Sequence, residues 1–442
     1  MNNNIIVNKF GGGILKKKFI PLMIERLNEQ IGNRYQPIVV VSALPGITDQ
    51  IVQFLNAKKF SKEINKKFIK NLTEKHNQVI LEIGIEDITK EKIKIELDRL
   101  FTNMEKDLVL ARTVLASEDK IISYGEKLSA TIFVEYLNSN NLSAKRILAE
   151  EIPIITDDNF KDANIVFKIS EKNIKNKISK IKEIPVIPGF TGITKDGIIT
   201  TLGRGGTDTT ACFIGSALRA HKVILWKDVD GVLSADPKIV KEAKTIPTIS
   251  YQEAEEAGKI IHEKAIQYPK MFGTPIEIAS IANPNSKTKI EPKENKQKGA
   301  KIVSYKKDLT LFLITDEVIK GNELLSMVSD VFLKNKVDIL LISNTRYSLQ
   351  IVSENNNNVA EKVLAELKKK VFKVETHPVS MVFLVGNFDV AYVNDFNSLL
   401  IKMKTDLEIS AFLYKNCTRL EAVIRTDKIE NIIRALYKKF II

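Results

Sequence analysis

The segment Thr200-Thr201-Leu202-Gly203-Arg204-Gly205-Gly206-Thr207-Asp208-Thr209-Thr210 combines glycines with an arginine and an aspartate, and it leads into an apolar run. Glycines let backbone N–H groups approach an anion closely, and a helix beginning near Thr207 would add its positive N-terminal end. The planar guanidinium of Arg204 suits a carboxylate or a phosphate. The segment therefore predicts a site for a small anionic molecule, although a glycine turn followed by a Thr or Asp helix cap would also fit this pattern.

Segments upstream of this one predict a parallel α/β sheet. The apolar run Ile5–Val7 leads into Lys9-Phe10-Gly11-Gly12-Gly13, and apolar residues at helical spacing follow between residues 20 and 31. A second apolar run, Ile38–Val41, comes next. The order strand, glycine loop, helix, strand is typical of parallel α/β folds.

Several candidate site residues follow directly after strand-like runs. These residues are Lys9, Ser42, Phe190 and Asp228. Ligand groups in open α/β sheets gather at the carboxyl ends of the strands. We therefore expect these four residues to belong to one shared site.

The composition narrows the class of protein. The chain has 442 residues, of which 44% are hydrophobic, and this length predicts two or three domains with a sizeable core. Its net charge of +13 comes mainly from dispersed lysines, which indicates solvated faces more than a nucleic-acid site. Cys212, Cys417 and four scattered histidines give neither a disulfide framework nor a metal spacing. With no signal peptide and no long apolar run, we expect a cytoplasmic protein that binds no membrane.

A change of pattern near residue 290 predicts additional domains. We place a first domain at residues 1–290, and a linker at 291–305 within a polar stretch that begins near residue 283. Two tail segments follow at 306–372 and 373–442. Each has the order strand, helix, strand, strand, helix, which is typical of ferredoxin-like domains.

The charged residues are compatible with phosphoryl transfer, which depends mainly on positioning and on positive charge. The sequence contains neither a P-loop nor the protein-kinase motifs, but backbone N–H groups of the Gly11–Gly13 turn could still hold phosphate. Lys9 and Arg204 add positive charge, and Glu126 and Asp208 could serve an ammonium group or Mg²⁺. A surface lysine, a helix-start acid and a helix cap are the structural alternatives for Lys9, Glu126 and Asp208.

Taken together, these motifs resemble those of aspartokinases, which have the amino acid kinase fold followed by a pair of ACT domains. The resemblance covers essentially the whole chain. It is carried by Lys9–Gly12, Ser123–Ser129, Thr200–Asp208 and Trp226–Val232 with Asp236-Pro237.

The resemblance implies ATP-dependent phosphorylation of the side-chain carboxylate of L-aspartate, the first step of lysine, threonine and methionine biosynthesis. Lys9 would stabilise the transferring phosphoryl group, Arg204 would hold the α-carboxylate, and Glu126 would bind the α-ammonium together with Asp208. Lys9 and Asp208 are thus the expected catalytic residues. The remaining expected site residues are Ser42, Thr48, Phe190 and Thr207 at the substrate, and Gly11, Gly12, Lys227, Asp228, Asp236, Lys238 and Lys259 around ATP, whose phosphates Mg²⁺ would bridge.

Two segments on the nucleotide side depart from the aspartokinase pattern. Gly13-Ile14 stands where Thr-Ser is usual, so a hydroxyl near the phosphates is missing. The region Glu256–Glu263 is shorter than usual and has Glu263 where a proline normally follows the histidine. These changes predict a divergent member and weaken the assignment of Lys259.

The tail resembles modules that bind an amino-acid effector, often lysine or threonine, and that pair between subunits as homodimers or higher homo-oligomers. In the family the two units can interleave, so the boundary near residue 373 need not separate them in space. Candidate effector positions are Gly321–Ser326 and Ser343–Arg346. Because Asn344-Thr345-Arg346-Tyr347 replaces a small, hydroxyl-rich segment, we expect weakened or altered feedback. Two alternatives stay open, a related kinase with another carboxylate substrate and a non-catalytic amino-acid sensor with a decayed kinase domain.

Overall fold

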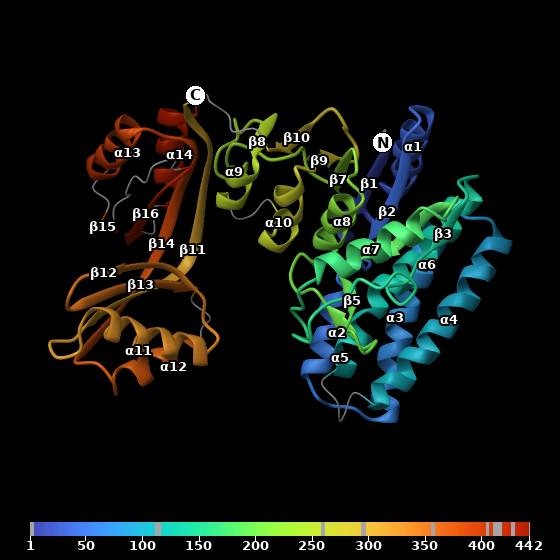
Figure 1. Ribbon diagram of the computed structural model, residues 1–442, viewed down its shortest axis with the longest axis horizontal. Coiled ribbons are helices and arrows are strands. Elements are labelled where there is room, and N and C mark those ends of the chain that lie inside the picture. The colour runs from blue at the N-terminus through green and yellow to red at the C-terminus, as the bar shows by residue number, and fades with distance from the viewer. Residues whose placement is uncertain are drawn as a thin grey trace. The chain divides into compact units, whose positions relative to one another are not determined.

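The computed structural model describes residues 4–110, 116–257, 261–292, 298–354, 359–403, 406–409, 418–425 and 429–441. The chain divides into two compact units, and the elements of both are labelled in Figure 1. One unit comprises Met1–Val232 and Thr245–Glu294, and the other comprises Leu233–Lys244 and Asn295–Ile442. Among the described residues, no helix has the length and apolar character needed to cross a membrane.

The first unit is built on an eight-stranded sheet with the order β3-β4-β2-β1-β7-β9-β10-β8. Strands β3 to β9 of this order run parallel to one another. The strands are β1 (Ile5–Phe10), β2 (Gln36–Val41), β3 (Ala144–Arg146), β4 (Ile184–Pro188), β7 (Lys222–Lys227), β8 (Thr248–Ser250), β9 (Ile276–Ser280) and β10 (Lys287–Glu291). A separate hairpin pairs β5 (Thr191–Ile193) with β6 (Ile199–Thr201).

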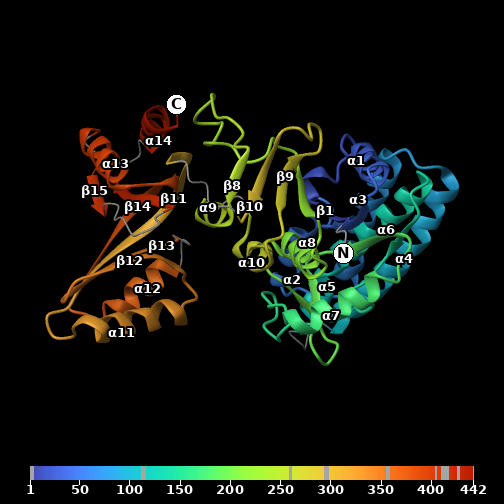
Figure 2. The ribbon, with the colours of Figure 1, turned by 45° about the horizontal axis from the view of Figure 1, so that its top comes forward.

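Helices cover both faces of this sheet, which explains why its central strands are apolar throughout. Alternate residues of β1 point to opposite faces: Ile6 and Phe10 join the larger core, whereas Val7 lies beside Gly215 of α8. Figure 2 shows the same helices from a second direction. The helical elements of the unit are η1 (Gly12–Ile14), α1 (Ile20–Gly32), α2 (Ile47–Asn56), α3 (Lys62–Glu82), α4 (Asp87–Leu110), α5 (Ala116–Ile122), α6 (Tyr124–Ser139), α7 (Phe167–Ile178), α8 (Gly206–Ala217), α9 (Tyr251–Glu256) and α10 (Glu263–Phe272).

The polar stretch expected to be a linker or exposed loop contains a strand. β10 pairs antiparallel with β9 and parallel with β8. Its side chains alternate, so that Thr288 and Ile290 are buried while Lys289 is exposed. The lysine-rich composition concealed this period-two pattern, which is the pattern of a strand with one buried face.

The second unit contains a six-stranded antiparallel sheet with the order β12-β13-β11-β14-β16-β15. Its strands are β11 (Gly299–Thr315), β12 (Ile339–Asn344), β13 (Ser348–Glu354), β14 (Lys373–Asn387), β15 (Asp406–Ile409) and β16 (Arg419–Arg425). Its helices are α11 (Gly321–Lys334), α12 (Val359–Leu367), α13 (Val390–Lys402) and α14 (Ile429–Phe440). The expected order strand, helix, strand, strand, helix occurs twice, which confirms the ferredoxin-like pattern of the tail.

The two longest strands run through both halves of this sheet. Leu309–Thr315 of β11 pairs with β13 and with the start of β14, whereas Gly299–Lys306 pairs with the end of β14. The end of β14 pairs in turn with β16. Each half therefore uses part of a strand that leads into the other half. β11 also begins inside the segment 291–305 that was expected to be a linker, while the proposed domain boundaries themselves stay predictions.

A short segment from the middle of the chain packs against this second sheet. Ala235, Ile239 and Val240 lie in the same apolar cluster as Val303 and helix α14. The backbone carbonyl of Ile239 accepts a hydrogen bond from Arg434 at 3.1 Å. Residues 233–244 therefore fold with the tail, although they are far from it in sequence.

Candidate functional site

An ion pair joins the end of β1 to the start of α8. Nζ of Lys9 lies 2.6 Å from Oδ1 of Asp208, and Nζ of Lys227 lies 3.5 Å from Oδ2 of the same carboxylate. Burial by itself would raise the pKa of Asp208, but the ammonium groups of Lys9 and Lys227 hold that pKa below its usual value. The strands β1 and β7 are neighbours in the sheet, so their carboxyl ends bring the two lysines to one carboxylate.

The glycine segment forms a tight turn into α8, which begins at Gly206, one residue before the expected start near Thr207. Gly205 has φ +72°, and a Cβ atom there would lie 2.6 Å from Cβ of His262, so both the backbone and the space require glycine. A Cβ atom at Gly206 would lie 2.5 Å from the ring of Phe190. The turn places Arg204 on the wall of a pocket.

Glu126 lies in the first turn of α6 and is buried. Its Oε1 accepts a hydrogen bond from the backbone N–H of Ala43 at 3.2 Å, whereas Oε2 has no hydrogen-bond partner within the described residues. Burial raises the pKa of this carboxyl to about 8, against the opposing effect of the Ala43 N–H. A buried carboxyl with an unused oxygen suits a ligand that brings its own donor, such as an ammonium group.

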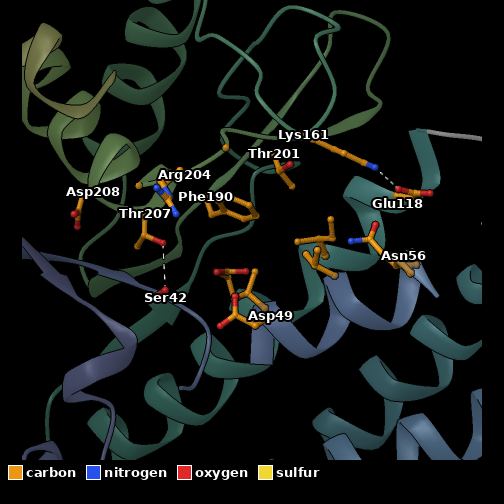
Figure 3. Close-up of a pocket in the computed structure, with 18 of the residues that line it drawn as sticks. Ser42, Asp49, Asn56, Glu118, Lys161, Phe190, Thr201, Arg204, Thr207 and Asp208 are labelled. Atoms are coloured by element: carbon orange, nitrogen blue, oxygen red, sulfur yellow. Dashed lines mark hydrogen bonds and ion pairs between the residues drawn. The ribbon is translucent and has the colours of Figure 1, made fainter. Parts of the chain in front are cut away.

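One pocket of about 570 Å³ collects the residues predicted for substrate and catalysis. Figure 3 shows Arg204, Phe190 and Thr207 close together, and Oγ1 of Thr207 donates a hydrogen bond to Oγ of Ser42 at 3.4 Å. All eight predicted residues line this pocket: Lys9, Ser42, Thr48, Glu126, Phe190, Arg204, Thr207 and Asp208.

The pocket also has walls that were not predicted. Val52 and Asn56 continue one face of α2 beyond Thr48 at four-residue spacing, which could have identified them, and Asp49 lies next to Thr48. Glu118 and Lys161 form the other wall, where Nζ of Lys161 lies 2.5 Å from a carboxylate oxygen of Glu118 (Figure 3). Nothing in the sequence links these last two residues, because they are 43 positions apart.

The residues predicted for the nucleotide have different placements. Gly11 adjoins the Lys9 ammonium, and the carboxylate of Asp228 lies close to Gly13, so the loop after β1 and the end of β7 meet. Asp236 and Lys238 belong to the second unit, where a carboxylate oxygen of Asp236 accepts a hydrogen bond from Tyr305 at 2.9 Å. Lys259 lies outside the described residues.

The sheet, the helix N-terminus and the charged pocket define an α/β protein with a small-molecule site at the carboxyl ends of parallel strands. Residues 4–280 match the sequence model of the family described as "Amino acid kinase family". This match spans more than half of the chain, and the protein belongs to the amino acid kinase family.

Known proteins and solved structures resemble this chain over nearly its full length. "Aspartokinase 3, chloroplastic" from Arabidopsis thaliana is 25% identical over 98% of this chain and 81% of the relative. An aspartokinase from Rickettsia prowazekii is 26% identical over 91% of this chain and 77% of the relative. The structure of E. coli aspartokinase III in complex with aspartate and ADP has 21% identity and a TM-score of 0.81, and covers 98% of this chain and 99% of that chain. These similarities confirm the resemblance to aspartokinases, and the structural match confirms the fold.

Proposed function

We propose that this protein transfers the γ-phosphoryl group of ATP to the side-chain carboxylate of L-aspartate, forming 4-phospho-L-aspartate and ADP. The observation that carries the proposal is the single pocket in which Lys9 and Arg204 lie with Glu126 and Asp208. Two cationic and two carboxyl groups match a ligand that has two carboxylates and one ammonium group. The similarity to aspartokinases supports the same substrate. The reaction would be the first step of lysine, threonine and methionine biosynthesis.

In this proposal the amino acid is held by its α-substituents. Arg204 binds the α-carboxylate with its guanidinium fork. Glu126, with Asp208, accepts hydrogen bonds from the α-ammonium. Ser42, Thr48, Phe190 and Thr207 line the pocket around it. The side-chain carboxylate is then free to face Lys9.

The chemical step needs little from the protein beyond positioning and charge. A carboxylate oxygen of aspartate forms a bond to the γ-phosphorus, while the bond from that phosphorus to the β,γ-bridging oxygen breaks and its electrons leave with ADP. The carboxylate is already ionised, so no general base is required. Lys9 stabilises the negative charge of the transferring group, and Asp208 orients Lys9 through their ion pair.

Gly11, Gly12, Lys227 and Asp228 are proposed to bind ATP, together with Asp236, Lys238 and Lys259 as the sequence predicted. No group of three or more His, Cys, Asp or Glu side chains gathers as a metal site among the described residues. Mg²⁺ commonly uses one or two carboxylates with phosphate oxygens and water. Asp208, which lies 3.5 Å from Nζ of Lys227, and Asp228, which follows Lys227 in the sequence, could supply them. When bound, Mg²⁺ would neutralise charge on the phosphates.

The tail is proposed to be regulatory. A solved structure of E. coli aspartokinase III is described as a complex with lysine and aspartate, which supports lysine as an effector of this chain, and threonine is the alternative that the sequence predicted. We also propose a homodimer or larger homo-oligomer, weakened or altered feedback and a cytoplasmic location, all as the sequence predicted.

Turnover with a panel of amino acids tests the proposed activity. Purified protein is incubated with ATP, Mg²⁺ and hydroxylamine, which traps acyl phosphates as hydroxamates. We expect hydroxamate with L-aspartate and not with L-glutamate. Product from another carboxylic acid alone would indicate a different substrate. Binding of amino acids without any product would favour the sensor.

A further inference from the structure

A buried carboxylate behind the pocket ties together two segments of its wall. Asp119 of α5 is fully buried, and its Oδ2 accepts three hydrogen bonds. The donors are the backbone N–H of Lys161 at 2.9 Å, the backbone N–H of Thr201 at 2.7 Å and Oγ1 of Thr201 at 3.1 Å. Burial raises the pKa of Asp119, while these donors oppose the rise. Three donors on one oxygen make this carboxylate a fixed point between segments that are distant in sequence.

The segments held by Asp119 lead directly into the loop that carries Arg204. The backbone N–H of Ala163 donates to the carbonyl of Thr201 at 2.9 Å, so residues 161–163 lie alongside the end of β6. Two positions after Thr201, Gly203 rests against Asp162 so closely that a Cβ atom would overlap its carboxylate. Lys264 forms an ion pair with that carboxylate. The start of the arginine loop therefore has a rigid base.

The other end of the loop is fixed by α8. The loop passes into α8 at Gly206, whose N–H donates to the carbonyl of Gly203 at 3.0 Å, and at the opposite end of the loop the N–H of Leu202 donates to the carbonyl of Phe190 at 2.9 Å. Arg204 thus projects from a short loop that is held at both ends. Asp119 does not line the pocket, but its neighbour Glu118 does.

We propose that Asp119 is a positioning residue for recognition of the substrate's α-carboxylate. By holding Thr201 and Lys161, it fixes the loop Leu202–Gly206 so that the guanidinium of Arg204 meets that carboxylate. This inference rests on the proposed function, and it assigns Asp119 no contact with the substrate. Because an arginine fork requires defined geometry, loosening the base of the loop should weaken aspartate binding far more than ATP binding.

A double-mutant cycle between Asp119 and Arg204 tests the proposal. We expect Asp119→Ala to raise the KM for aspartate at least tenfold while the KM for ATP stays within twofold. Asp119→Ala/Arg204→Ala should be no worse than Arg204→Ala alone, because Asp119 acts through Arg204. Additive effects, or equal changes for both substrates, would overturn the proposal.

Thr201, which itself lines the pocket, offers a smaller change than Asp119→Ala. Thr201→Val removes one donor to Asp119 and should raise the KM for aspartate about threefold or more. Thr201→Ser retains the donor and should keep the KM for aspartate near that of the wild type. Lys120→Ala, on the same helix, controls for loss of helix stability and should leave both KM values within twofold. An unchanged KM for aspartate in both Thr201→Val and Asp119→Ala would refute the proposed positioning role of Asp119.

A substrate without an α-carboxylate separates this role from general destabilisation. β-Alanine keeps the amine and the reacting carboxylate, so the preference for L-aspartate over β-alanine reports the Arg204 contact. We expect this preference to narrow in Asp119→Ala and to be retained in Lys120→Ala. An unchanged preference in Asp119→Ala would overturn the proposal.

Calorimetric binding of L-aspartate, measured for each protein of the double-mutant cycle, is independent of turnover. Binding of L-aspartate without phosphorylation would reject the proposed function, and the binding data would still test the positioning role of Asp119. A wild type that neither binds nor phosphorylates L-aspartate would reject both the proposed function and the positioning role.

Discussion

Nζ of Lys9 lies 2.6 Å from Oδ1 of Asp208, in a site where both side chains are largely shielded from water. The pair connects the end of β1, just before one loop, to the first turn of α8, just after another. Lys227 makes a longer contact with the same carboxylate. Asp208 can therefore hold Lys9 in place while Lys227 limits the cost of a buried negative charge.

Substitution of Lys9 should strongly reduce turnover. We expect Lys9→Ala to lower kcat by about 10²–10³-fold, the usual scale for removing one preorganised charge donor. Steady-state kinetics at saturating aspartate and ATP measure the effect. Lys17→Ala, in the exposed segment that follows, is the matched control and should keep normal turnover. A near-normal kcat in Lys9→Ala would remove Lys9 from the mechanism.

Aspartate binding should strengthen as pH rises through the pKa of Glu126. Burial raises that pKa to about 8, so the carboxyl is mostly neutral at pH 7 and must lose its proton to pair with an ammonium group. We expect the KM for aspartate to fall roughly tenfold between about pH 7 and about pH 9. Glu126→Gln should remove this dependence and bind aspartate weakly throughout, and a pH dependence retained in Glu126→Gln would contradict the assignment.

The same pKa gives a stability prediction with a defined sign. The folded protein keeps a proton on Glu126 that the unfolded chain releases above its ordinary pKa of 4.5. The contribution of Glu126 to the free energy of unfolding should therefore decline from about pH 5 to about pH 8. Urea unfolding of the ligand-free wild type and of Glu126→Gln measures it. The difference between the two proteins should grow with pH, and a constant difference would argue against the raised pKa.

Two glycines with positive φ allow the effect of backbone strain to be distinguished from the effect of a steric contact. Gly205→Ala and Gly197→Ala each place a side chain at φ +72° or +80°, which costs about 1 kcal/mol. Only the first also places Cβ against His262, since no atom lies within 4 Å of the corresponding position at Gly197. We expect Gly205→Ala to lower the urea midpoint more and to raise the KM for aspartate. If the two variants changed the urea midpoint and the KM for aspartate equally, the His262 contact would be unimportant.

Much of the site could be predicted because parallel strands bring their carboxyl ends to one edge of a sheet. Lys9 and Lys227 leave adjacent strands, and each therefore reaches Asp208. The wall formed by Glu118 and Lys161 was not predicted, because contacts between a helix and a loop depend on tertiary packing. No local sequence period records such a contact.

The tail shows a similar limit. Its repeated strand and helix order follows from hydrophobic spacing, but the length of β11 does not. The residues Gly299–Lys306 gain their strand partner from the distant end of β14, and the lysines among them concealed the pattern. Likewise, Ala235 and Ile239 pack with the tail through contacts that no short motif encodes.

The departure at Gly13 can be tested by adding the hydroxyl that the resemblance leads us to expect. Gly13 is exposed, and a Cβ atom there would lie 3.7 Å from the carboxylate oxygens of Asp228, which is an ordinary contact. A serine should therefore fit without displacing the loop. Its hydroxyl would lie at the proposed phosphate end of the site.

We expect Gly13→Ser to lower the KM for ATP about two- to tenfold, the effect of one net hydrogen bond, and to leave the KM for aspartate unchanged. Gly13→Ala is the matched control, since it adds the same Cβ atom without the hydroxyl. An equal fall in both variants would assign the gain to a stiffer loop. No fall in either would mean that the loop already binds the phosphates through its backbone N–H groups, so that the missing hydroxyl carries no penalty in this protein.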